Sequence, residues 1–208
     1  MAISDDIRAF LPQFLSREST DELFSCLDDF PENIDSRMYC DRTRAENFFA
    51  QGDGVKSLKL VDWKTESLKD ARVILLSNTC DISPENSRTF TPNCVYCVVF
   101  ELEKYLALLR NRGKSEQHID NVRKEITKQR STTLFYLPKG QGLEKDCVAM
   151  LDHVGSCPYD RLDSSKVKLF SLSNYGFYMF LLKLSIHFTR IRDGLDRSDK
   201  ITISSAVN

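Results

Sequence analysis

Residues 51–99 read QGDGVKSLKLVDWKTESLKDARVILLSNTCDISPENSRTFTPNCVYCVV, and this stretch decides the fold. Residues 55–63 alternate between apolar and polar side chains with one slip, which predicts a strand. A polar connector ends at Arg72, and the apolar runs 73–76 and 94–100 then predict two buried strands, since β-branched and aromatic residues favour extended backbone. The loop between the buried strands carries polar side chains that form a candidate binding site: Thr79, Cys80 and Asp81.

Helical patterns lie on both sides of this β region. Residues 4–15 have an apolar stripe at helical spacing, and a second helix is expected from Ser19 or Thr20 to the residue before Pro31. Residues 101–130 interrupt the β pattern with two amphipathic helices separated at Gly113, which predicts an inserted helical hairpin. Further strands are expected at three places: 132–137, 147–151 and 166–170. A long apolar helix is expected from Ser173, buried against the sheet or in a dimer interface.

Composition limits the classes of function. The formal net charge of −1 gives no global attraction to nucleic acid or to an anionic membrane, so nucleic-acid binding requires a local basic patch. Seven cysteines, an odd number, and a start without an apolar leader predict a cytoplasmic protein with thiols rather than disulfides. The most apolar segment, residues 175–191, is too short and too polar to cross a bilayer, so no membrane contact is expected.

The order of turn, strand, Arg-headed strand and later Asp-containing segment resembles the PemK/MazF-like toxin superfamily. The matching pieces are Gln51-Gly52-Asp53, Arg72 to Asn78, and Val148 to Val154 followed by Arg161-Leu162. A closer likeness is to bacterial members with a Ser-x-x-Cys-Asp turn, which here is Ser77 to Asp81. A Leu-Pro pair and a His-Phe step in the C-terminal helix also match: Leu137-Pro138 and His187-Phe188.

This resemblance implies a small SH3-like β-barrel. The predicted fold class is therefore α+β, with a small bent antiparallel sheet or an SH3-like barrel, N-terminal helices, the inserted hairpin and a C-terminal helix. The predicted parts are an N-terminal helical segment, a barrel with its insertion, a packed C-terminal helix and a tail: 1–47, 48–172, 173–192 and 193–208.

The resemblance also implies a toxin-like or defence-associated function on RNA in bacteria, as a metal-independent endoribonuclease without a cofactor. It implies a protein partner such as an antitoxin, and a homodimer. Two departures favour an alternative, a catalytically inactive barrel that serves as a binding or sensing subunit. The usual Arg-Pro is Arg72-Val73 here, and a strand that normally ends in a catalytic Thr or Ser ends in Phe100-Glu101.

Cleavage of RNA by its 2′-hydroxyl requires a proton acceptor, a proton donor and a cation at the phosphate. Arg72 supplies a guanidinium that matches phosphate oxygens, His153 is a natural proton shuttle, and Asp152 serves as base or orients a neighbour. In the alternative interpretation, Arg72 pairs with Asp70 or Asp53, and Asp152 and His153 form a turn. The catalytic interpretation predicts that Arg72 and the Asp152-His153 pair converge on one surface.

The remaining candidates have structural alternatives. Cys80 is either a nucleophile or a packed thiol. Cys94 and Cys97 have half the spacing of a zinc site, but residues three apart in a strand point to opposite faces, so no metal site is expected. The basic hairpin is either a nucleic-acid patch or a solvated helix face. With the turn residues, the candidate binding residues are Asp53, Arg123, Lys124 and Lys128.

Overall fold

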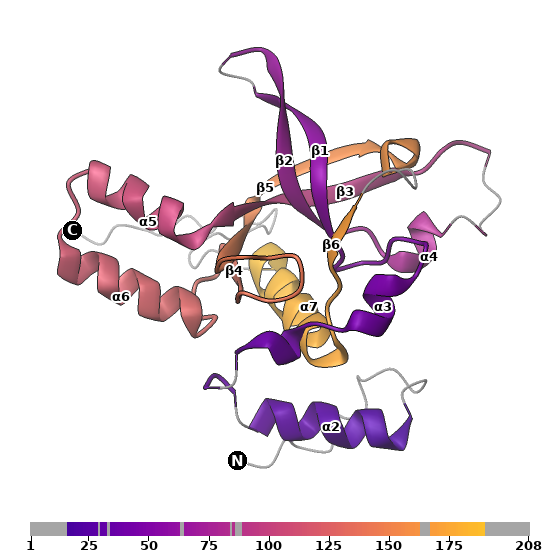
Figure 1. The fold of residues 1–208 in the computed structure, drawn as a ribbon, viewed down its shortest axis with the longest axis horizontal. Helices are drawn as coiled ribbons and strands as arrows, with labels where there is room; N and C mark the ends of the chain where they lie inside the picture. Colours follow the sequence, from indigo (N-terminus) through magenta and orange to yellow (C-terminus); the bar gives the residue numbers. More distant parts are fainter. Residues whose placement is uncertain are drawn as a thin grey trace, which may run out of the picture.

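The computed structural model describes residues 16–28, 30–32, 34–62, 65–83, 85, 89–162 and 167–189. These residues form a six-stranded antiparallel sheet in the order β4-β5-β3-β2-β1-β6, with helices on both sides (Figure 1). The α+β class is thereby confirmed. Within the described part of the chain the sheet is open, with β4 and β6 at its edges, and it is not closed into a barrel. The helix predicted at 4–15 and the tail at 193–208 lie outside the described residues.

The elements have the following bounds. The strands are β1 (Gly54–Asp62), β2 (Ser67–Leu75), β3 (Asn93–Glu101), β4 (Leu134–Leu137), β5 (Cys147–Pro158) and β6 (Lys168–Phe170). The α-helices are α2 (Arg17–Asp28), α3 (Asp41–Ala45), α4 (Thr79–Ile82), α5 (Leu102–Asn111), α6 (Glu116–Thr127) and α7 (Asn174–Thr189). Two short 3-10 helices are η1 (Ser36–Met38) and η2 (Tyr159–Leu162).

Two strands are longer than predicted. The expected polar connector before Val73 is part of β2, because it pairs in antiparallel register with β1 as far as Asp62 and Ser67. β5 was expected to end at Leu151, but it continues to Pro158 because the first half of β3 supplies its partners. The expected strand end at Leu151 and the alternative Asp152-His153 turn are therefore both wrong: this segment is strand, with a β-bulge.

The helical hairpin is confirmed as α5 and α6. Ser115 caps α6, since its side-chain oxygen accepts a hydrogen bond from the backbone N–H of His118 at 3.3 Å. Gly113, with φ of +76°, allows the sharp turn between the helices. The apolar sides of the helices pack on β4 and β5 through a cluster that includes Leu106, Ile119 and Val148. The hairpin therefore covers one face of the sheet at its β4 end.

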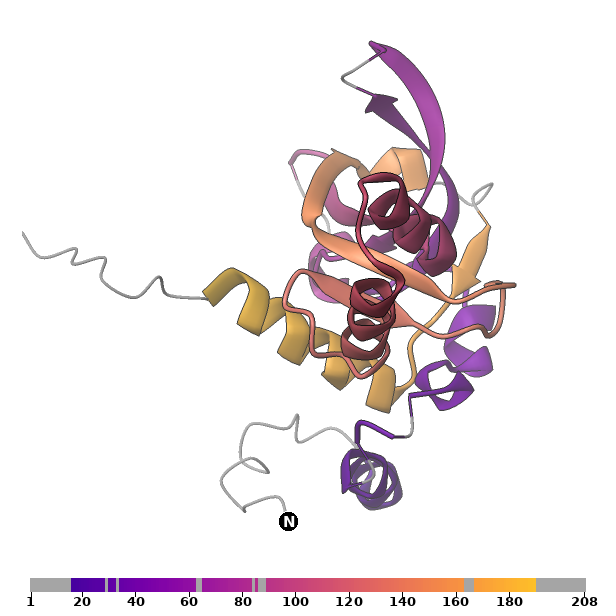
Figure 2. The same ribbon diagram turned by 90° about the vertical axis from the view of Figure 1, so that its left-hand side faces the viewer.

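Helix α7 covers the opposite face, and α2 packs against α7 (Figures 1 and 2). Phe180 packs beside Phe135 of β4, with ring centroids 5.1 Å apart, and both belong to the largest buried cluster. The C-terminal half of α7 is more exposed than predicted, because Leu182, Ile186 and Phe188 face outward. The dimer interface expected for this helix stays a prediction. None of the described helices has the length and apolar content needed to cross a membrane.

Strands β1 and β2 extend beyond the sheet as a two-stranded arm (Figures 1 and 2). β3 pairs with β2 only over residues 72–75, and β6 is in register with β1 only at Gly54 and Val55. We define the arm as residues 58–62 and 67–71, which pair with each other and with no other described strand. The arm therefore offers an open surface next to the body of the protein.

Candidate functional site

Three basic side chains gather around one carboxylate where β3 ends and α5 begins. Glu101 accepts hydrogen bonds from Nη2 of Arg72 at 3.2 Å, Nζ of Lys104 at 3.0 Å and Nζ of Lys145 at 3.4 Å. The Glu101 side chain is only 15% exposed, whereas both lysines are largely exposed. We call these four residues the cationic cluster. These four residues carry three positive charges and one negative charge, and Asp146, next to Lys145, adds a second negative charge nearby.

Strand register explains why these residues meet. Arg72 is paired with Val99, two residues before Glu101, so both side chains point to the same face of the sheet. Glu101 is paired with Cys147, and Lys145 lies two residues before that position. Lys104 is one helical turn beyond Glu101 and approaches it along α5. Three separate segments thus place their charges at one corner of the sheet.

The electrostatics of the cluster favour an ionised Glu101 carboxylate and a neutral Cys147 thiol beside it. The hydrogen bond from Lys104 lowers the pKa of Glu101, and Lys145 acts in the same direction. Burial raises the pKa of the neighbouring Cys147 thiol, although the Arg72 guanidinium opposes this. Cys147 therefore remains protonated at neutral pH and is no candidate nucleophile.

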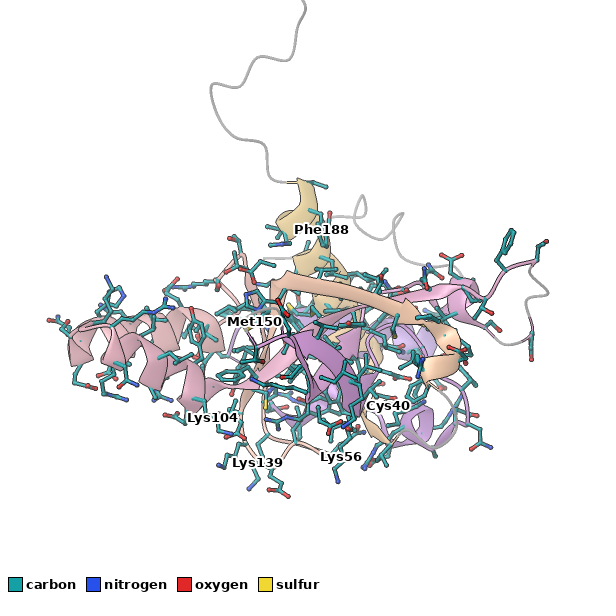
Figure 3. All side chains as sticks on the ribbon, turned by 90° about the horizontal axis from the view of Figure 1, so that it is seen from above. Cys40, Lys56, Lys104, Lys139, Met150 and Phe188 are labelled. Carbon is teal, nitrogen blue, oxygen red and sulfur yellow. The ribbon has the colours of Figure 1, made fainter. Side chains whose placement is uncertain are left out.

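Further lysines lie on this side of the molecule. Figure 3 shows Lys56 and Lys139 on the same side as Lys104, with Phe188 at the end of α7 on the opposite side. Lys139 belongs to the β4–β5 loop, which also supplies Lys145. These lysines therefore lie on a different side of the molecule from the exposed apolar end of α7.

Asp152 and His153 do not contact Arg72. Cys97 pairs with Val154 while Val98 pairs with Met150, so the intervening residues of β5 form a bulge. Burial raises the pKa of the Cys97 thiol and the Asp152 carboxylate adds to this, which places Asp152 near Cys97. Among the described residues the Arg72 guanidinium is paired with Glu101, and not with Asp152 or His153. With β3 in between, β2 and β5 are about 10 Å apart.

Asp53 has a structural position. It is buried, with Lys168 Nζ 3.0 Å from Oδ2, and it accepts hydrogen bonds from the Ser171 hydroxyl and the Ala50 backbone N–H. Burial raises the pKa of Asp53, against the opposing effects of these partners. Asp53 thus joins the start of β1 to β6. The partner of Arg72 is Glu101, so the alternative pairing with Asp70 or Asp53 was wrong.

The turn residues after β2 form α4, a helix that the sequence did not predict. Asn78 caps it by accepting a hydrogen bond from the Cys80 N–H at 2.9 Å, and the Thr79 hydroxyl accepts one from the Gln51 N–H at 3.0 Å. Cys80 is exposed, and Asp81 lines a cavity of about 610 Å³ that Phe188 also lines. Because β2 and β3 are antiparallel, α4 and the cationic cluster lie at opposite ends of these strands.

The basic residues of the hairpin are mostly paired with acids. Arg123 forms two hydrogen bonds with Glu103, one of them 3.0 Å long, and Lys128 contacts Glu32 at 2.6 Å. Lys124 is exposed and forms no ion pair with a described residue. These pairs reduce the net charge that the hairpin presents, so the cationic cluster is the stronger candidate for an anion site.

The cysteines show no metal site. Cys94 and Cys97 belong to different buried clusters on opposite faces of the sheet, as the strand period predicted. The described part of the chain contains no group of three His, Cys, Asp or Glu residues that could hold a metal ion. All seven cysteines lie in the described ranges, and none forms a disulfide there.

Comparison with known proteins gives no match: the sequence matches no protein-family model and no curated protein. The resemblance to PemK/MazF-like toxins therefore rests on the motifs alone. Sequence reasoning missed the convergence at Glu101. One signal was available for Glu101, because it stands where related strands end in Thr or Ser. Lys104 follows Glu101 at helical spacing, which was also visible. Nothing in the sequence singled out Lys145.

Proposed function

We propose that this is a toxin-like or defence-associated protein that binds RNA, with an RNA phosphate held by the cationic cluster. The observation that carries the proposal is the convergence of Arg72, Lys104 and Lys145 on one carboxylate. The chain as a whole has a net charge of −1, so binding to a polyanion requires such a local site. Contacts to phosphates supply much of the affinity for nucleic acid.

The arrangement of the cluster suits phosphate binding. Arg72 is 29% exposed and is held by Glu101, so its guanidinium is oriented before a ligand arrives. The planar fork of arginine matches two phosphate oxygens, and the exposed lysines add mobile ammonium groups. Glu101 has two opposing effects, because it orients Arg72 but also repels an incoming anion. Replacing Glu101 by Gln should therefore strengthen RNA binding.

The binding or sensing role is the better supported of the two roles expected from the sequence. Arg72 of β2 is paired with Glu101 at the end of β3, whereas Asp152 and His153 lie on the β5 bulge. The fold would then derive from the PemK/MazF-like superfamily. In this proposal helices have been added to an SH3-like core, and the sheet of that core is open. A protein partner such as an antitoxin and a cytoplasmic location belong to the same proposal.

A second candidate is a metal-independent endoribonuclease, which the contact between Arg72 and Glu101 favours. In this reaction the Glu101 carboxylate accepts the 2′-hydroxyl proton, and the 2′-oxygen forms a bond to phosphorus. The bond from phosphorus to the 5′-oxygen breaks, and the ammonium of Lys104 or Lys145 protonates that oxygen. Arg72 stabilises the charge on the phosphate during the displacement.

The variant Glu101→Gln distinguishes the two candidates. Purified protein is incubated with total RNA with and without EDTA, and binding of a fluorescent single-stranded RNA is followed by anisotropy. The binding role predicts intact RNA and a lower Kd for Glu101→Gln. The enzyme predicts EDTA-resistant cleavage that Glu101→Gln abolishes. A wild-type protein that neither binds nor cleaves RNA at low salt would contradict both candidates.

A further inference from the structure

The arm carries an exposed apolar pair. Val61 and Leu68 are cross-strand partners, and they are 48% and 66% exposed. The arm extends away from the body of the molecule (Figures 1 and 2). Apolar side chains grouped on a projecting element are typical of a contact surface. The arm therefore has a face suited to an apolar ligand group.

This apolar pair lies on the same face as the cationic cluster. Side chains alternate along a strand, so Leu68, Asp70 and Arg72 of β2 point to one side. On β1, Val61 is opposite Leu68 and Lys59 is opposite Asp70, with Lys59 Nζ 2.7 Å from the Asp70 carboxylate. The face thus runs from an apolar outer end, past an ion pair, to the cluster. Leu68 and Arg72 are about 13 Å apart along the strand.

We infer that the ligand of this face is single-stranded RNA, with a phosphate on the cationic cluster and an unpaired base on Val61 and Leu68. The inference rests on the proposed function and specifies its ligand. Basic residues at one end complement the backbone charge. At the other end, aliphatic side chains can cover the flat face of an unpaired base and remove it from water. A duplex keeps its bases stacked inside and cannot offer one to the arm.

The face that Leu68 shares with Arg72 distinguishes RNA from a protein strand as the ligand. No other described strand pairs with either edge of the arm, so a protein strand could also add there. Such an addition uses backbone groups at an edge and does not involve the face that Leu68 shares with Arg72. The shared face therefore favours RNA, and the protein strand becomes an outcome of the test.

Fluorescence anisotropy with a labelled 12-nucleotide RNA, free or annealed to its complement, tests the inference. Leu68→Ser changes a largely exposed side chain, so the fold is preserved, and Val61→Ser repeats the test from β1. Phe90→Ser is the matched control, because Phe90 is exposed on the segment before β3. Each arm variant should weaken single-strand binding about 5-fold, with duplex binding and the salt dependence unchanged, since only a base contact is removed.

The outcomes separate this inference from the proposed function. Equal affinity for both RNA forms, together with unchanged binding by Leu68→Ser and Val61→Ser, would overturn the inference and leave the phosphate site intact. Failure of the wild-type protein to bind either RNA at low salt would overturn the proposed function itself.

Discussion

Lys183 of α7 allows a quantitative test of how this helix packs against the segment between α6 and β4. The side chain is 5% exposed, and its Nζ donates hydrogen bonds to the backbone oxygens of Gln129, at 2.8 Å, and Ser131. No carboxylate among the described residues pairs with it. Burial lowers the pKa of Lys183 from 10.5 to about 8. This lowering corresponds to about 3 kcal/mol of preference for the neutral amine in the folded state.

The sign of the pH effect follows from proton binding. Below pH 8 both states hold the proton, and the folded state bears the cost of burying the charge. Between about pH 8 and pH 10.5 the unfolded state binds more protons, so the contribution of Lys183 to the free energy of unfolding rises with pH. The neutral amine retains two N–H donors, which match the two backbone oxygens, so the contacts persist.

The assay is urea unfolding of the wild-type protein and Lys183→Met between pH 7 and pH 10. The difference in unfolding free energy between them should grow in favour of the wild type by about 2 kcal/mol over this range. Comparison with the variant cancels the titration of buried tyrosines and cysteines. Lys114→Met, at an exposed lysine, should show no such trend. A wild-type minus Lys183→Met difference that is constant with pH would refute the reasoning.

Three further changes test the structure. Asp53→Asn leaves the Lys168 ammonium buried without its counter-charge, so the free energy of unfolding in urea should fall by about 3–5 kcal/mol; an unchanged value would contradict its structural role. Gly54→Ala would place a Cβ 2.3 Å from the Phe170 ring, and a lower thermal midpoint is expected; an unaltered midpoint would argue against this close contact. Ser115→Ala removes the cap of α6 and should cost about 1 kcal/mol, measured by urea titration, while equal stability would exclude the cap.

Elements with a strong local signal were predictable from the sequence. The hairpin followed from two amphipathic stripes with Gly113 and Ser115 between them, and both residues act as expected. The β3 strand followed from its β-branched and aromatic residues. In these cases the side chains that specify the element also lie within it, so no distant partner was needed to recognise it.

Features that depend on distant partners were not predictable. The polar start of β2 is a strand because β1 pairs with it, and the second half of β5 is a strand because β3 does. The same limit applies to the site. Glu101 meets Arg72 through strand register and Lys145 through a loop, and local sequence does not encode either meeting. Asp53 likewise gains its partner Lys168 only when β6 joins the sheet.

The salt dependence of RNA binding tests the central claim most directly. Lys145 is exposed and contributes one positive charge to the cationic cluster, so Lys145→Ala should preserve the fold while removing one phosphate contact. The slope of log Kd against log salt concentration should become shallower by about 0.7 for this variant, and Lys114→Ala should keep the wild-type slope. Equal slopes for wild type and Lys145→Ala would contradict a phosphate site at the cationic cluster.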